Sequence, residues 1–194
     1  MLEHITDKTV SGVIVLLSLT GLRQSEARGL RWADWNEADQ TLTICRSVWQ
    51  TKLGPTKNPA SENTILVLLL LNDLLTKRRV RIKRTPSDYI LAGMRRGAPL
   101  NFHNLENRVI KPDLKDSGIV WAGFHAFRRG LASNLLALEV NRVIIGRILR
   151  QGGVATTLAY YAKNRENESR AVMEKLEERI RNRLSGVTIG GKEI

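Results

Sequence analysis

Apolar residues recur at helical spacing along most of the chain, so most of it is predicted to be helical. The first helix is expected to begin at Asp7 or Thr9 and to break at Thr20 and Gly21. Another helix is expected to stop before Pro112, and a later one at the Gly152–Gly153 pair. The predicted helices cover about 7–20, 23–32, 72–84, 101–110, 124–137, 141–150, 156–163 and 166–184.

Two stretches have a strand-like pattern instead. The segment QTLTICRSVW (40–49) alternates and is rich in β-branched residues, and TILVLLL (64–70) is continuously apolar. A loop rich in glycine, proline and asparagine lies between them, so the pair is expected to form a hairpin or a short meander. DYILAG (88–93) is expected to be a short extended piece. The predicted fold is α+β, mainly α-helical with a small antiparallel sheet, in one domain over 1–184 with a disordered tail at 185–194.

Charge narrows the choice of partner. The 194 residues carry 31 Lys and Arg against 19 Asp and Glu, a net charge of +12, which favours a polyanion. Nucleic acid is the first candidate, an anionic membrane surface the second, and a merely soluble basic protein the alternative. The single cysteine, Cys45, excludes an intrachain disulfide and a multi-cysteine zinc site, and its place in the alternating run suggests a small buried apolar residue. No basic leader follows Met1, and the longest apolar run is too short for a membrane span, so a reducing, cytoplasmic setting is expected.

Four stretches combine residue types that can act on a phosphate. They are TGLRQSEARGLRW, GPTKNPAS, FHAFRRG and ATTLAYYAK. Each alone would ordinarily be read as a solvated charge, a structural histidine or a packed tyrosine pair. The residues that stand out in them are Arg23, Lys57, His125, Arg128, Tyr160 and Tyr161.

Taken in this order, the four stretches resemble the catalytic domain of the tyrosine recombinases, or phage-type integrases. That family carries TGLR-x-x-E-x-x-x-L-x-W, a hairpin lysine, H-x-x-R, then L-G/R-H-x-x-x-x-T-T and a tyrosine. Here they stand as TGLRQSEARGLRW, Lys57, HAFR and LRQGGVATTLAYY, and the resemblance runs from about residue 8 to 184. It implies site-specific DNA cleavage and rejoining in DNA recombination or integration by a mobile element.

The resemblance also implies roles for the basic residues. Arg23 and Arg128 would clamp the non-bridging oxygens of the scissile phosphate, and their charge would replace a metal ion. His125 would hydrogen-bond the phosphate or move a proton to or from the tyrosine. Lys57 would protonate the departing 5′ oxygen, and Glu26 would orient Arg23.

Attack by a tyrosine hydroxyl would give a 3′-phosphotyrosyl link that can be resealed without ATP. The nucleophile lies three or four residues after Thr157, which leaves Tyr160 and Tyr161 open. Lys163, two residues beyond Tyr161, favours Tyr161.

Two departures from the family pattern are visible. Gln151 stands where the family usually has histidine and sometimes tryptophan, so one donor cannot carry charge or relay a proton. The family usually has an N-terminal core-binding domain, which is expected to be absent here because the first catalytic-domain helix starts close to Met1. Weaker DNA affinity and site choice would follow.

A basic block and the last helix are predicted to make further contacts. The block TKRRVRIKR holds six cations and MRRG two more, which are either DNA-phosphate contacts or a solvated helix face. The last helix packs either on its own domain or on a neighbouring subunit, as in the family's tetrameric synapse on DNA. The predicted DNA-binding residues are Lys77, Arg78, Arg79, Arg81, Lys83, Arg84, Arg95 and Arg96.

Two rival functions remain open at this stage. A decayed recombinase would bind double-stranded DNA without cutting it, and a type IB topoisomerase would relax supercoils without sequence choice. No cofactor is expected. A metal site is not expected either, because His4, His103 and His125 are scattered without ligand spacing.

Overall fold

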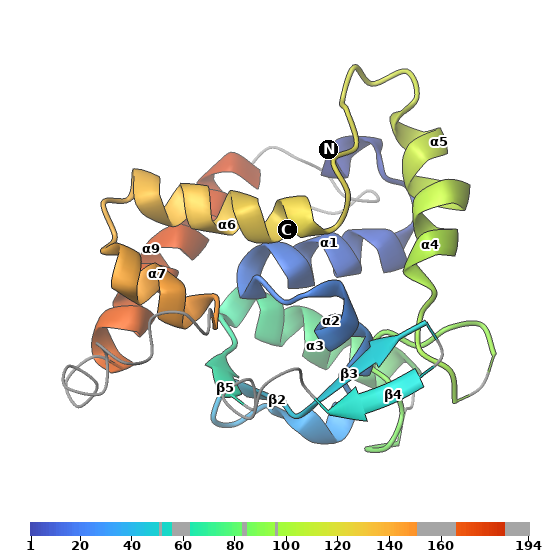
Figure 1. Cartoon of the computed structure of the whole chain (residues 1–194), viewed down its shortest axis with the longest axis horizontal. Helices are drawn as coiled ribbons and strands as arrows, with labels where there is room; N and C mark the ends of the chain where they lie inside the picture. Colours follow the sequence, from blue (N-terminus) through green and yellow to red (C-terminus); the bar gives the residue numbers. More distant parts are fainter. Residues whose placement is uncertain (51, 56–62, 83–84, 96, 151–165, 185–194) are drawn as a thin grey trace.

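The structure is a computed structural model that describes residues 1–50, 52–55, 63–82, 85–95, 97–150 and 166–184. It is mainly helical with two small antiparallel sheets, in agreement with the predicted fold class. Helix α1 runs through the middle of the molecule, with α6 on one side and α3 on the other (Figure 1). This arrangement buries α1 on almost every side.

Helix α1 (Lys8–Thr20) begins and ends where its sequence predicts. Of the two candidate caps, Asp7 serves: its Oδ1 accepts from the backbone N–H of Thr9 at 2.6 Å and of Val10 at 3.1 Å. Gly21 ends the helix in the left-handed conformation with φ of 60°. A short 3₁₀ turn, η1 (Leu2–His4), precedes α1.

Leu22 and Arg23 separate Gly21 from helix α2 (Gln24–Gly29), and the 3₁₀ turn η2 (Trp32–Asp34) comes next. The first sheet has the order β1-β2-β5, from β1 (Trp35–Asn36), β2 (Thr41–Ile44) and β5 (Asn63–Leu66). Its pairs are antiparallel, with Leu42 opposite Ile65.

The single strand expected over 40–49 is in fact two strands. The chain leaves the first sheet at Cys45 and continues as β3 (Arg46–Trp49), which pairs with β4 (Lys52–Pro55) in a separate hairpin. The loop prediction for 50–63 was therefore wrong over β4. Cys45 is half-buried rather than buried, and its thiol lies 3.6 Å from the Asp34 carboxylate. The alternation of inward residues continues across the break, which is why the pattern did not reveal it.

Helix α3 (Leu69–Ile82) starts three residues earlier than predicted and takes over the end of the apolar run read as a strand. Beyond it, the predicted extended piece 88–93 makes only isolated bridges, Arg31 with Tyr89 and Ala92 with Pro99.

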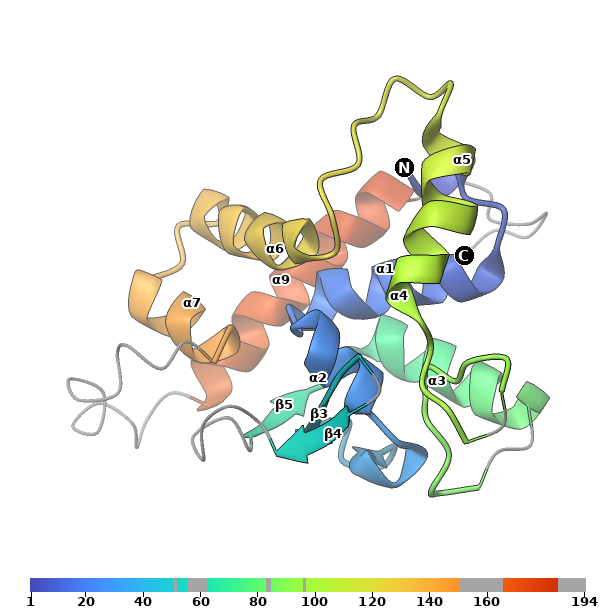
Figure 2. The same ribbon diagram turned by 45° about the vertical axis from the view of Figure 1, so that its right-hand side comes forward.

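Pro112 does not stop the helix expected over 101–110. Helix α4 (Phe102–Leu105) continues through a π-helical turn, η4 (Glu106–Ile110), directly into α5 (Lys111–Leu114). Pro112 lies in the first turn of α5, where its missing N–H and fixed φ are tolerated. Figure 2 shows the three segments stacked as one column beside α1.

Three helices complete the described part of the chain: α6 (His125–Ala137), α7 (Arg142–Ile148) and α9 (Glu166–Leu184). Helix α7 ends at Ile148, earlier than predicted. Helix α9 packs on its own domain, with Met173 and Leu176 buried in the common core and in contact with α6. Ile180 on the same helix is half-buried, while the side chain of Leu184 lies outside the described residues.

Candidate active site

The first residue of the site lies at the start of α2. Arg23 is the N-cap of this helix, and its backbone N–H donates to Glu26 Oε2 at 2.9 Å. Its guanidinium Nη1 donates to Glu26 Oε1 at 2.7 Å. The Arg23 side chain is 42% exposed while that of Glu26 is 4% exposed. Glu26 therefore holds Arg23 from beneath and leaves part of its guanidinium open to solvent.

Arg128 lies beneath the surface and is held by backbone carbonyls. It comes from the second turn of α6, and its Nη1 donates to the carbonyl of Gly21 at 2.6 Å. Its Nη2 donates to the carbonyl of Leu149. These carbonyls lie at the C-terminal ends of α1 and α7, so Arg128 ties three helices together. Burial, reinforced by the charges of Arg23 and Arg150, lowers the pKa of Arg128 to about 10.

Arg150 is a member of the site that the sequence analysis missed. Its Nη2 donates to Glu26 Oε2 at 3.0 Å, and its side chain is only 2% exposed. Burial lowers the pKa of this guanidinium, the Glu26 carboxylate opposes the shift, and the charge of Arg23 adds to it. The only hint in the sequence was the place of Arg150 in LRQGG, which does not reveal where the side chain points.

Glu26 is the common partner in this cluster. Its burial acts to raise the pKa, but Arg150 and the hydrogen bonds and charge of Arg23 outweigh burial, and the pKa is lowered. Glu26 therefore stays ionised between the two arginines. Arg23, Arg128 and Arg150 bring three positive charges to one carboxylate, which leaves an excess of two positive charges, with Arg23 partly open to solvent and the other two arginines buried. Such an excess favours an anion.

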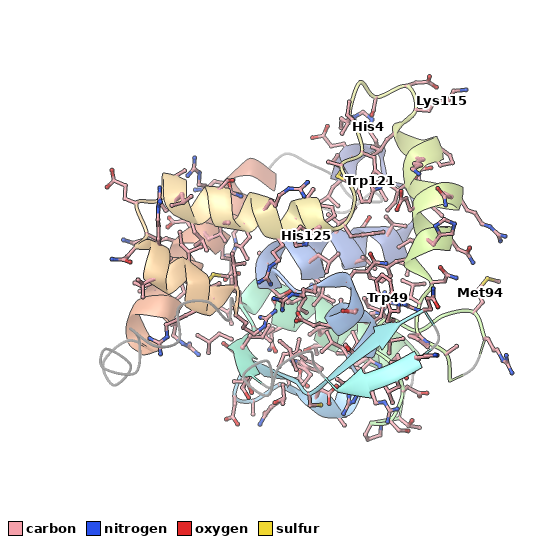
Figure 3. The ribbon with its side chains drawn as sticks, viewed as in Figure 1. His4, Trp49, Met94, Lys115, Trp121 and His125 are labelled. Carbon is pink, nitrogen blue, oxygen red and sulfur yellow. The ribbon has the colours of Figure 1, made fainter. Side chains whose placement is uncertain are left out.

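Arg23 and Arg128 thus lie together, as the resemblance implied, since the charge of Arg23 acts on Arg128. His125 begins α6 one turn before Arg128, and its ring is exposed (Figure 3). Phe124 anchors this end of α6, with ring centroids 4.6 Å from Phe102 and 5.0 Å from Trp121. Phe127, in the first turn of α6, is half-buried.

The remaining catalytic candidates lie outside the described residues. These candidates are Lys57, Gln151, Tyr160 and Tyr161. Their predicted roles stay predictions.

The basic block has a mixed environment. Lys77 and Arg79 are exposed on α3, and the Arg79 guanidinium lies 6.0 Å from the ring of Trp35. Arg78 is half-buried against α1, and Arg95 is exposed. Figure 2 places the C-terminal end of α3 across the molecule from α7. Lys83, Arg84 and Arg96 lie outside the described residues, as does the side chain of Arg81.

Another arginine of the first motif has a structural role. Arg28 donates to three backbone carbonyls, those of Leu100 at 3.0 Å, Val48 at 3.2 Å and Gln50 at 2.6 Å. It joins α2 to the β3–β4 hairpin and to the chain before α4. Beside it is a hollow of about 300 Å³ that is lined in part by the exposed Trp49. Trp49 is labelled in Figure 3.

In the described part of the chain, no helix is long and apolar enough to cross a membrane. The same residues contain no group of three or more histidine, cysteine or acidic side chains that could hold a metal ion.

Comparison with protein families matches residues 2–168 to the phage integrase family. The chain belongs to this family. The resemblance noted in the sequence is therefore confirmed. No curated protein matches.

Solved structures of phage integrases and their relatives share the fold. The Tn1549 transposon integrase, solved with a circular intermediate DNA, has a TM-score of 0.66 at 20% identity, covering 90% of this chain and 62% of that one. XerA recombinase has a TM-score of 0.59 at 20% identity, covering 93% and 61%. The integrase from mycobacterium phage Brujita has a TM-score of 0.62 at 16% identity, covering 88% and 52%. The chain therefore spans about three fifths or less of the length of these integrases.

Proposed function

We propose that this chain is the catalytic part of a tyrosine site-specific recombinase, which cuts and rejoins DNA strands. The observation that carries the proposal is that the partly exposed Arg23 lies near the buried Arg128, with excess positive charge, in a chain of the phage integrase family. Guanidinium groups can donate paired hydrogen bonds to the oxygens of a phosphate.

The proposed reaction needs a phosphodiester between these arginines. The tyrosine oxygen attacks phosphorus while the bond to the 5′ oxygen breaks, which leaves a 3′-phosphotyrosyl link and a 5′ hydroxyl. His125 holds the phosphate or accepts the phenol proton, and Lys57 donates a proton to the departing oxygen. The two arginines stabilise the charge that grows on the non-bridging oxygens, so neither metal nor ATP is required.

Double-stranded DNA is the proposed partner, and the solved Tn1549 integrase complexes with DNA support it. Self-association in a tetrameric synapse on that DNA belongs to the proposal, as does work in a prokaryotic cytoplasm at the nucleoid for a mobile element. The basic residues of α3 and Arg95 are proposed to contact DNA phosphates.

Covalent capture on nicked DNA tests the proposal. A pool of duplexes with randomised sequence around a nick would be incubated with the chain, so that cleavage releases a short 5′-hydroxyl fragment and traps the adduct. We expect a denaturant-resistant protein–DNA adduct, whose attached strand reveals the target sequence. Binding without any adduct would instead support the decayed, non-catalytic form.

Separate substitutions of the two tyrosines identify the nucleophile. Tyr161→Phe removes the attacking oxygen and is expected to abolish the adduct, whereas Tyr160→Phe, the matched control, is expected to retain it. Peptide mapping of the adduct measures the same point directly. Loss of the adduct in Tyr160→Phe alone would move the nucleophile to Tyr160.

A further inference from the structure

Glu26 receives hydrogen bonds from two distant parts of the chain. Arg23 supplies two donors, its backbone N–H at 2.9 Å and its Nη1 at 2.7 Å, and both come from the helix start that Glu26 itself caps. The third donor is Nη2 of Arg150 at 3.0 Å, from a residue 124 positions later in the sequence. Arg150 is thus the described partner that fixes Glu26 against the rest of the molecule.

The Arg150 side chain is placed to act on Glu26 and not on DNA directly. It is 2% exposed, so it does not present a surface to a duplex. Two of its nitrogen atoms, Nε and Nη1, are buried without a hydrogen-bond partner among the described residues. An arginine buried in this way is costly, and its ion pair with Glu26 offsets that cost.

The backbone at this point adds a second observation. Arg150 has φ of 52°, in the left-handed region that favours glycine. The chain turns sharply here after α7, which directs the side chain back toward the start of α2. Its neighbour Leu149 supplies the carbonyl that holds Arg128. One turn of chain therefore supports both arginines that we assign to the phosphate.

From this geometry we infer that Arg150 is a positioning residue for strand cleavage: it fixes Glu26, and through Glu26 it orients the guanidinium of Arg23. The inference rests on the proposed function. Among the described residues, removal of Arg150 leaves the Glu26 carboxylate with donors from Arg23 alone, so the pair can rotate together. The guanidinium of Arg23 then spends less time in the orientation that meets the phosphate.

The chain offers a control for loss of an arginine ion pair in Arg46, whose side chain is 24% exposed. Asp34 caps η2 through Arg31 N–H at 2.7 Å and forms an ion pair with Arg46, in the same way that Glu26 caps α2 and pairs with Arg150. Arg46 lies on β3, and its hydrogen bonds among the described residues go to Asp34 and to the carbonyl of Gly29, not to Arg23, Glu26 or Arg128. Arg46→Met therefore breaks a similar ion pair while leaving the Arg23–Glu26–Arg150 cluster intact.

The first measurement needs no cleavage. In ¹⁵N spectra of the full chain, the Arg23 Nε–Hε signal reports whether this guanidinium is held. We expect Arg150→Met to move the signal to the position of a free arginine, and Arg46→Met to leave it unchanged. An unchanged Arg23 signal in Arg150→Met would overturn the inference, whether or not the wild-type chain cuts DNA.

The second measurement separates chemistry from binding on the captured target duplex. Arg150→Met is expected to lower the rate of adduct formation about 100-fold, because a displaced catalytic group costs this much, while duplex affinity changes little. Arg150→Lys keeps the charge and restores part of the rate. Combining Arg150→Met with Glu26→Gln is expected to be no slower than Glu26→Gln alone, because both act along one path.

The opposite results are equally clear. If Arg46→Met slowed cleavage as much as Arg150→Met, the effect would be one of stability and the inference would fail. Melting temperatures of all variants identify any that do not fold, and Arg150→Lys then carries the comparison. Absence of adduct in the wild-type chain would reject the proposed function, and the Arg23 signal would still decide the role of Arg150.

Discussion

Gly21 combines two requirements that no other residue type meets. Its φ of 60° ends α1 in the left-handed region. A Cβ added there would lie 2.7 Å from Leu149 Cδ2 and 2.9 Å from Leu131 Cδ2, closer than real contacts allow. The carbonyl of the same residue holds Arg128. Local conformation, core packing and the site therefore meet at one position.

Gly21→Ala is expected to destabilise the chain by about 2–4 kcal/mol, because it adds left-handed strain to overpacking. Urea unfolding measures this change. The matched control is Gly130→Ala on α6, where a Cβ meets nothing within 4 Å and a helical glycine is replaced. The control should gain up to about 1 kcal/mol. Equal stability of the two variants would contradict the packing argument.

At the residue scale, the motifs pointed to Arg23 and Arg128, which the structure places near each other. Arg23 and Arg128 were found because their residue types and spacing carry a motif. Arg150 was not, because its role depends on a turn after α7 and on a carboxylate 124 positions away. Periodicity describes neighbours along one helix and carries no information about such distant contacts.

At the element scale, helices with strong apolar spacing were predicted well, among them α9 and α1, which also has a clear N-cap. The strands were predicted less well. The alternation through 40–49 fits one strand as well as two, and only tertiary contacts separate β2 from β3. The prediction that Pro112 ends a helix was wrong for a related reason. A π turn before Pro112 allows the helical column to continue through it.

Helix α9 is attached by a polar contact as well as by its buried stripe. The carboxylate of Glu177, which is buried, accepts from the backbone N–H of Leu70 in the first turn of α3 at 2.8 Å. A carboxylate at this end of a helix satisfies a free N–H and the helix dipole together. Arg181 on the same helix holds the carboxylate in place at 2.9 Å.

Glu177→Ala is expected to weaken this attachment by about 1–3 kcal/mol, because the half-buried N–H of Leu70 loses its acceptor. Hydrogen exchange followed by mass spectrometry should show lower protection across α9 and the first turn of α3, with α1 unchanged. Glu178→Ala, at the exposed neighbouring position, is the control and should keep the wild-type pattern. Equal exchange in both variants would mean that the apolar stripe alone holds α9.

At the scale of the whole molecule, the net charge is +12. DNA binding through basic residues should therefore weaken as the salt concentration rises, and this dependence tests which residues contact phosphates. Neutralising Lys77, Arg79 or Arg95 to glutamine should reduce the slope of log affinity against log salt by about 0.9 for each DNA phosphate that the side chain neutralises. Fluorescence anisotropy with a labelled duplex measures the slope. Lys115→Gln, on the arm beyond α5 (Figure 3), should leave it unchanged. Identical slopes in all four variants would mean that Lys77, Arg79 and Arg95 are solvated surface charges and do not contact DNA phosphates.

The packing of α9 sets a condition on any assembly of several copies. Met173 and Leu176 of α9 already occupy the part of the core that a helix from another copy would have to enter. A helix from another copy would compete with the chain's own α9, whose covalent attachment keeps its local concentration high. Exchange between copies would thus begin with release of the chain's own α9. Binding of several copies along one stretch of duplex would raise the concentration of competing α9 helices and so favour exchange.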